Sequence, residues 1–127
     1  MTKPVDVARC IAAGLGIDFA TVRQRARVLR DAGLVEPNPK GRGKGTTTPR
    51  DAASLLIVSA MGEPLVESAR VASAMRSAVD RVAHDITSGA SGGPYAFDMR
   101  VSSALTRTAV VEPGVVASLS ALFDGSP

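Results

Sequence analysis

The chain is poor in several residue types on which particular activities depend. It has one cysteine, Cys10, one histidine, no tryptophan and only 3% aromatic residues. A single cysteine excludes an internal disulfide framework and a zinc site of the Cys-x-x-Cys kind. No apolar run approaches the ~18 residues that a membrane span requires. Pro4, Asp6 and Arg9 also interrupt the region where a signal peptide would be apolar. We therefore expect a cytoplasmic protein without a membrane partner.

The usual patterns of enzyme active sites are missing as well. His84 lies on a predicted helix near Asp80 and Asp85, where a surface residue is more common than a catalytic base. The glycines at 41–45 lack the Gly-Lys-Ser/Thr ending of a phosphate-binding loop. The serines are scattered through predicted helices with no nucleophile elbow. We expect no enzymatic activity, no cofactor and no metal ion.

Length and composition favour a mainly α protein with a small β component. A chain of 127 residues can form one domain, or a small domain plus an oligomerisation segment. Apolar residues make up 45% of the chain, but aromatic residues make up only 3%. The core must therefore be built from Ala, Val, Leu, Ile and Met, which favours closely packed helices.

Charge is distributed unevenly along the chain. Residues 1–50 carry ten Lys and Arg against four Asp and Glu, whereas residues 51–127 carry five against eight. This asymmetry predicts a basic module at 1–50 with an anionic partner, and a region at 51–127 that mediates oligomerisation or binds a partner protein.

Helix signals dominate the first half. Apolar spacing predicts a first helix from residue 5 to about residue 13, ended by the glycines at 14 and 16. Asp18 and Gly33 are suited to cap a second helix that extends to residue 32. Residues 36–47 form a loop or a ragged hairpin because proline, glycine and cationic residues dominate them. Thr48, Pro49 and Asp51 then start a helix over 49–61, which is apolar nearly all round and should be buried on more than one side.

The second half combines a long helix with β-structure. Residues 64–86 have apolar side chains at steps of three and four, which predicts one long helix. These side chains form a narrow apolar stripe, called the seam below, which packs in the core, in a dimer interface or in both. The seam residues are Leu65, Ala69, Ala72, Met75, Val79, Val82 and Ile86. A Gly/Ser linker follows at 87–93. Alternation over 97–111 predicts a β-hairpin or strand, with a turn near Ser102 and Ser103. A short helix over 115–123 ends the chain.

The most informative segment is 22–35, which places four arginines (positions 23, 25, 27 and 30) on one short helix. An apolar stripe on that helix comprises Phe19, Val22, Ala26 and Leu29. Arg23, Arg27 and Arg30 lie on the adjoining flank, and the basic loop 40–45 follows. A cationic helix followed by a cationic loop is what gripping a nucleic-acid backbone and reading a groove require.

This segment also supports a resemblance to a known family. It ends in Val28-Leu29-Arg30-Asp31-Ala32-Gly33-Leu34-Val35. This run resembles the end of the recognition helix of bacterial winged helix-turn-helix regulators, and residues 12–17 are similar to the short helix and turn that precede it. The resemblance covers about residues 5–50. It implies a winged helix-turn-helix head at 1–50, followed by a long helix and a C-terminal β-hairpin or strand.

The resemblance also implies a set of DNA-binding residues. These are Thr21, Arg23, Gln24, Arg27 and Arg30 on the helix and Lys40, Arg42 and Lys44 in the wing. Of these, Thr21, Arg23, Gln24 and Arg27 should face the major groove, while the wing residues touch phosphates or the minor groove. Arg23 and Arg27 have an alternative role in ion pairs with Asp31 or other acids. The expected wing departs from the family pattern, because the prolines at 37 and 39 argue against a regular β-wing, although a basic loop would serve the same electrostatic role.

We therefore expect a sequence-specific transcriptional regulator, bacterial or phage-encoded, associated with the nucleoid. Its partners would be double-stranded DNA and a second copy of itself, with a dimer favoured and an inverted-repeat site. The segment order also resembles small phage or gene-transfer-agent proteins. One alternative is the small terminase subunit, which joins a similar head to an oligomerising hairpin and forms rings. Another is a basic module that binds an acidic protein and no DNA.

Overall fold

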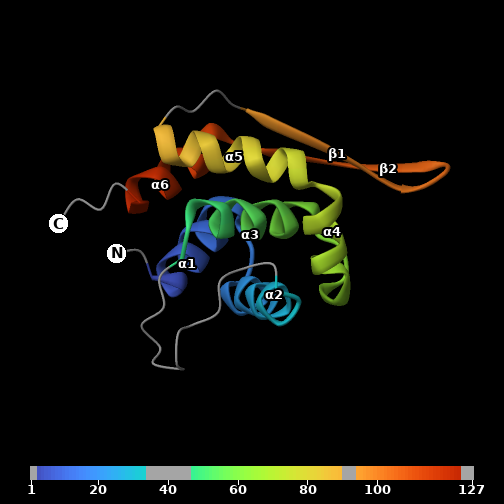
Figure 1. Ribbon diagram of the computed structural model, residues 1–127, viewed down its shortest axis with the longest axis horizontal. Helices are drawn as coiled ribbons and strands as arrows, with labels where there is room; N and C mark the ends of the chain where they lie inside the picture. Colours follow the sequence, from blue (N-terminus) through green and yellow to red (C-terminus); the bar gives the residue numbers. More distant parts are fainter. Residues whose placement is uncertain (1–2, 34–46, 90–93, 124–127) are drawn as a thin grey trace.

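A computed structural model describes residues 3–33, 47–89 and 94–123 of the chain (Figure 1). It confirms a mainly helical protein with a small two-stranded antiparallel sheet. In chain order the elements are α1 (Pro4–Leu15), α2 (Phe19–Asp31), α3 (Pro49–Met61), the 3-10 turn η2 (Leu65–Glu67), α4 (Ser68–Ala74), α5 (Arg76–Ser88), β1 (Tyr95–Ser102), β2 (Leu105–Val111) and α6 (Pro113–Phe123). No helix in these described ranges is long and apolar enough to span a bilayer.

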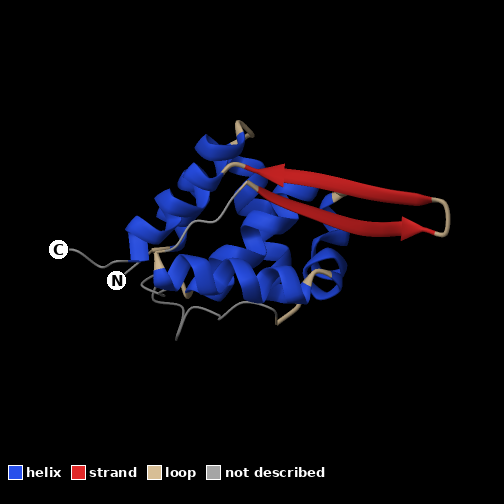
Figure 2. Cartoon of the chain, turned by 90° about the horizontal axis from the view of Figure 1, so that it is seen from above, coloured by secondary structure: helices blue, strands red, loops and turns tan. Residues whose placement is uncertain are grey.

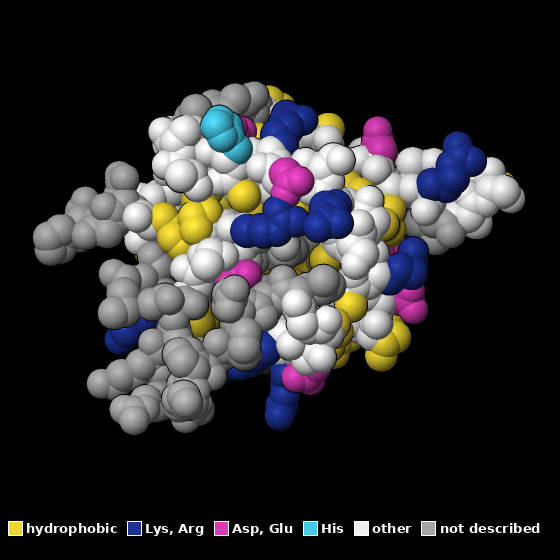
Figure 3. Space-filling view, in the orientation of Figure 1, with side chains coloured by type: hydrophobic (Ala, Val, Ile, Leu, Met, Phe, Trp, Pro, Cys, Tyr) yellow, Lys and Arg dark blue, Asp and Glu magenta, His cyan; other side chains and the backbone are white. Residues whose placement is uncertain are grey.

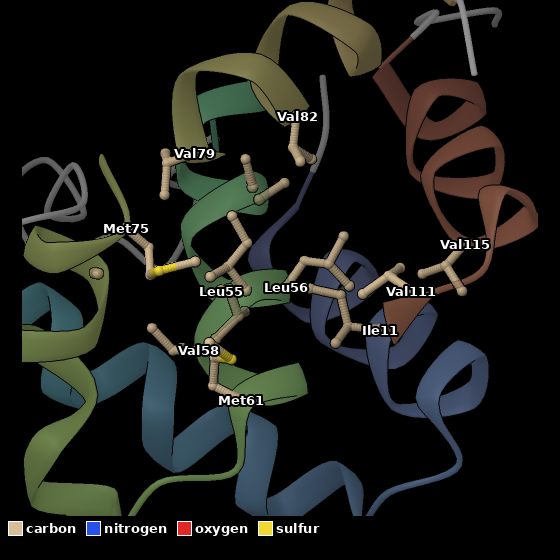
Figure 4. Packing of buried hydrophobic residues seen from close by; sticks show 14 of the residues in the cluster. Ile11, Leu55, Leu56, Val58, Met61, Met75, Val79, Val82, Val111 and Val115 are labelled. Carbon is tan, nitrogen blue, oxygen red and sulfur yellow. The ribbon is translucent and has the colours of Figure 1, made fainter. Parts of the chain in front are cut away.

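Helix α3 is the centre of the molecule, and its bounds agree with the prediction. Thr48 and Asp51 form the expected capping box: the Asp51 N–H donates to Thr48 Oγ1 at 3.1 Å, and the Thr48 N–H donates to Asp51 Oδ2 at 3.2 Å. Nearly every residue of α3 is buried, because α1, α2, α4, α5, α6 and β2 all pack against it. Figure 4 shows its side chains meeting Ile11 of α1, Val79 and Val82 of α5 and Val115 of α6. The prediction of burial on more than one side is confirmed.

Helix α1 runs through Gly14 to Leu15, two residues beyond the expected end. A Cβ atom at Gly14 would lie 2.8 Å from Cγ2 of Val115, so glycine allows α1 and α6 to approach closely. The helix ends instead at Gly16, whose φ of +69° is the left-handed conformation that glycine adopts without strain. The helix therefore ends within the segment 14–16 that was expected to break it, but at Gly16 and not at Gly14.

The single long helix expected over 64–86 is wrong. The chain forms η2 and α4, leaves the helical conformation at Met75 (φ −101°, ψ 26°), and continues as α5. The interruption lets both α4 and α5 pack against α3. The later seam residues, Ala72, Met75, Val79, Val82 and Ile86, are buried in the core. They belong to the same hydrophobic cluster as Ile11, Val22 and Leu29, so this core extends across the boundary expected near residue 50.

Strands β1 and β2 form the predicted hairpin, with Ser103 and Ala104 at its turn. At the base the inward side chains are buried: Tyr95, Phe97, Met99, Ala109 and Val111. The register is regular from Tyr95 to Arg100, after which one extra residue in β1 forms a bulge. Beyond the base the hairpin projects past the helices, and Leu105 near its tip is exposed (Figures 1 and 2). The last helix starts at Pro113, two residues earlier than predicted.

Candidate nucleic-acid interface

Helices α1 and α2 pack against each other and are joined by residues 16–18. A connection of three residues that contains a glycine is one of the features of a helix-turn-helix. Asp18 caps α2 as predicted, because its Oδ2 accepts the Thr21 N–H at 3.3 Å. Val22 and Leu29 are fully buried, and Phe19 and Ala26 are half-buried against the same core. The predicted apolar stripe is confirmed, and it fixes which face of α2 points outward.

Four of the predicted binding residues lie together on the exposed side of α2. Arg23, Gln24, Arg27 and Arg30 are all exposed and line a groove of about 850 Å³. The N-terminal parts of α1 and α3 form its other sides, and Lys3 adds a further cationic side chain. Figure 3 shows Lys and Arg side chains reaching the surface around α2, at the lower edge of the view.

The arginines of this face have no acidic partners in the described part of the chain. The alternative in which Arg23 and Arg27 pair with Asp31 is not observed there. Other arginines do form ion pairs, such as Arg50 with Asp80. Asp31 and Asp51 also line the groove, but Lys3, Arg23, Arg27 and Arg30 outnumber them, so the net positive charge of the groove favours an anionic ligand.

Thr21 lies apart from this group. At 3.6 residues per turn it is about 160° around the helix from Arg23, and its hydroxyl donates to Asp18 Oδ2 at 3.4 Å. It does not line the groove. The structure therefore gives Thr21 a part in capping α2 and does not bring it together with Arg23, Gln24 and Arg27.

Arg9 of α1, which was not among the predicted binding residues, lies beside the basic face but does not line the groove. Its guanidinium carbon lies 5.4 Å from the centroid of the Phe19 ring, and that of Arg23 lies 5.7 Å from the same centroid. The shared ring holds both guanidinium groups within about 11 Å of each other by cation–π contacts. Because the contact depends on how α1 packs on α2, no local pattern could reveal it.

Arg25, the fourth arginine of the segment, has a different position. It is 8% exposed, and its Nη1–H donates to the Oγ of buried Ser68 at 3.1 Å. Burial lowers the pKa of Arg25, and the nearby carboxylate of Glu63 opposes that shift. Arg25, which was not among the predicted binding residues, therefore adds no charge to the exposed face of α2. Its spacing was a usable signal, since it lies three residues after Val22 and four before Leu29, on the buried side.

The remaining predicted residues fall elsewhere. Lys40, Arg42, Lys44 and the whole expected wing lie outside the described residues. Among the described residues, no group of three or more His, Cys, Asp and Glu side chains is placed to hold a metal ion. Burial raises the pKa of the Cys10 thiol, which keeps this side chain in its neutral form.

No protein-family model, curated protein or solved structure matches the chain. What the α2 face can bind therefore follows from its own chemistry. It offers four guanidinium groups and one amide on two packed helices, with hydrogen-bond donors in excess and no carboxylate paired to them in the described ranges. Such a set suits phosphate oxygens and the edges of bases.

Proposed function

We propose that this protein binds double-stranded DNA through α2 and acts as a sequence-specific transcriptional regulator. The observation that supports this most directly is the row of Arg23, Arg27 and Arg30, exposed and without acidic partners in the described part of the chain. They lie on the second helix of the packed α1–α2 pair, and the opposite face of that helix is anchored in the core.

The side chains on this face divide into two roles. Arg27 and Gln24 project from the part of α2 farthest from the core, so they are placed to reach bases. An arginine can bind guanine through two hydrogen bonds, and a glutamine can bind adenine in the same way. Arg9 and Arg23, which both contact the Phe19 ring, bind phosphates of the backbone and set the position of the helix. Arg30 and the basic residues at 40–44 extend the phosphate contacts.

We further propose that the bound form is a dimer. Two copies related by a twofold axis would place their α2 helices about 34–36 Å apart, one helical turn of DNA. The preferred site would then be an inverted repeat with that spacing between its halves.

The test is a binding measurement against salt. A site is first selected from a random duplex library with the full chain, and affinity is then measured by fluorescence anisotropy for that site and for a scrambled duplex. Arg27→Ala should lose about 1–3 kcal/mol on the selected site and little on the scrambled one. Arg9→Ala should weaken binding to both duplexes and reduce the slope of log K against log salt by about 0.9.

Arg76→Ala is the matched control, because Arg76 is exposed at the start of α5, away from α2, and has no ion pair in the described ranges. It should change neither affinity nor slope. If an Arg23→Ala/Arg27→Ala protein retains full affinity and the same salt slope, α2 is not the DNA-binding helix. Binding of an acidic protein partner would then be favoured.

A further inference from the structure

One edge of the hairpin has no strand beside it in the described part of the chain. β1 pairs with β2 along one side only, and the sheet has two strands. A two-stranded ribbon in water is marginally stable unless a further strand or a helix supports it. Helices support the base of this hairpin, whereas its outer half projects beyond them (Figures 1 and 2).

A groove follows the free edge of β1. Its volume is about 350 Å³, and three consecutive β1 residues, Ala96, Phe97 and Asp98, form one side. Mostly small side chains from α4 and α5 form the other side, among them Ala74 and Ala78. No residue of β2 lines it, so the groove runs beside the edge of β1 and not beneath the sheet. An extended segment placed there would continue the sheet and lie against α4 and α5, the arrangement known as strand addition.

The charges on β1 indicate which segment fits. Asp98 and Arg100 are exposed on the same face of the strand, on either side of Met99. Arg100 has no ion pair among the described residues. One oxygen of Asp98 accepts a hydrogen bond from Thr108 at 2.6 Å, which leaves the other available. When β1 pairs antiparallel with a second copy of itself centred on Met99, Asp98 faces Arg100 of the second copy, and Arg100 faces its Asp98.

We propose that the edge of β1 is a self-association surface whose occupant is β1 of a second copy. The product is a four-stranded antiparallel sheet with two cross-strand ion pairs, a favourable combination for residues directly opposite each other. β2 contains no acidic residue, and its one charged side chain, Arg107, is already paired with Glu63, so the same pairing through the edge of β2 would form no cross-strand ion pair. Because the strands are antiparallel, the two helical bodies lie toward opposite ends of the sheet. The proposal does not depend on DNA being the ligand of α2.

The test uses the full chain and measures molar mass against concentration by sedimentation equilibrium. The wild type should form a dimer. Asp98→Arg puts two arginines opposite two arginines, and Arg100→Asp puts acids opposite acids, so each variant alone should self-associate at least about tenfold more weakly. An equimolar mixture of the two variants restores both ion pairs and should dimerise as tightly as the wild type. Glu112→Arg makes the same charge change as Asp98→Arg at an exposed position that does not line this groove, and it should leave dimerisation unchanged.

A further control separates charge from folding. Thr108→Val removes the hydrogen bond that Asp98 accepts within one chain and leaves both charges in place, so its dimer should persist. Four results would overturn the proposal. The first three are a monomeric wild type at every concentration, a dimer that both charge variants leave intact, and a mixture that fails to restore association. The fourth is a particle of eight or more copies, because an edge that pairs with itself about a twofold axis joins only two copies.

Discussion

Arg25 and Arg27 are two residues apart on α2, yet the structure gives them opposite environments. Arg25 is buried and bonded to Ser68, whereas Arg27 is exposed on the groove. Replacing each in turn by methionine keeps an unbranched apolar stem and removes the guanidinium group, and methionine favours helices about as well as arginine. The two substitutions therefore differ mainly in the surroundings from which a guanidinium group is removed.

The size of the Arg25→Met effect follows from the contacts that it loses. The hydrogen bond from Arg25 to Ser68 is buried and involves a charged donor, which contributes about 1.5–3 kcal/mol. Part of this is offset, because Arg25 Nε is buried without a hydrogen-bond partner among the described residues and already costs desolvation energy. Glu63 keeps its ion pair with Arg107. We expect a net loss of about 2 kcal/mol in the free energy of unfolding, or a Tm lower by roughly 5–10 °C for a chain of this size.

Arg27→Met should instead change stability by less than about 0.5 kcal/mol, as is usual for an exposed position, and weaken binding to the selected duplex about tenfold or more. Both variants are compared by thermal unfolding and by anisotropy at a temperature where each is folded. Ser68→Ala is the independent check: it should be destabilising alone and add little to Arg25→Met, because both remove one hydrogen bond. If Arg27→Met lowers Tm as much as Arg25→Met does, the assignment of inner and outer faces is wrong.

Two further predictions concern packing and capping. Gly14→Ala, which ordinarily stabilises a helix, should here destabilise the protein by about 1–2 kcal/mol, because the new Cβ would lie 2.8 Å from Val115 Cγ2. In a double-mutant cycle measured by chemical denaturation, Val115→Ala should relieve that cost, and a rise in Tm for Gly14→Ala alone would contradict the close contact of α1 and α6. Thr48→Ala removes one half of the capping box of α3 and should cost about 1 kcal/mol. Thr47→Ala is its control by the same assay, and equal effects of the two would mean that the cap contributes nothing.

Elements with a local start or stop signal could be predicted from the sequence. The ends of α2 and α3 were anticipated within a residue because Asp18, Thr48 and Pro49 act on backbone groups two or three positions away. Two departures from the prediction have the opposite origin. Gly14 lies within α1 and in close contact with Val115, about a hundred positions later in the chain, and no local pattern indicates that contact. The break at Met75 lies within a seam of unbroken three-and-four spacing, and it follows from packing of two short helices on α3.

In the candidate site, too, the features set by local sequence could be predicted and those set by distant contacts could not. Exposure of Arg23, Gln24, Arg27 and Arg30 follows from helical periodicity, which the sequence displays directly. Arg9 enters the site only because Phe19 lies between two helices that pack together. A buried arginine such as Arg25 is missed when positive charge is counted along a segment, because an arginine enters a core only where distant polar groups receive it.

Glu63 connects the two surfaces to which functions are proposed. Its carboxylate is 5% exposed, forms an ion pair with Arg107 of β2, lies 3.9 Å from Nη2 of Arg70, and acts electrostatically on Arg25 of α2. Arg107 is the register partner of Met99, the residue on which the proposed pairing of two β1 strands is centred. Glu63 is the buried member of this cluster, whereas Arg70 and Arg107 are half-exposed, and the buried carboxylate tolerates little displacement because leaving it unpaired in the interior is costly. The orientation of α2 relative to the hairpin is therefore set by packed side chains and not by a linker. It follows that a dimer joined through β1 holds its two α2 helices at a fixed separation, so DNA half-sites with one spacing should bind far better than any other.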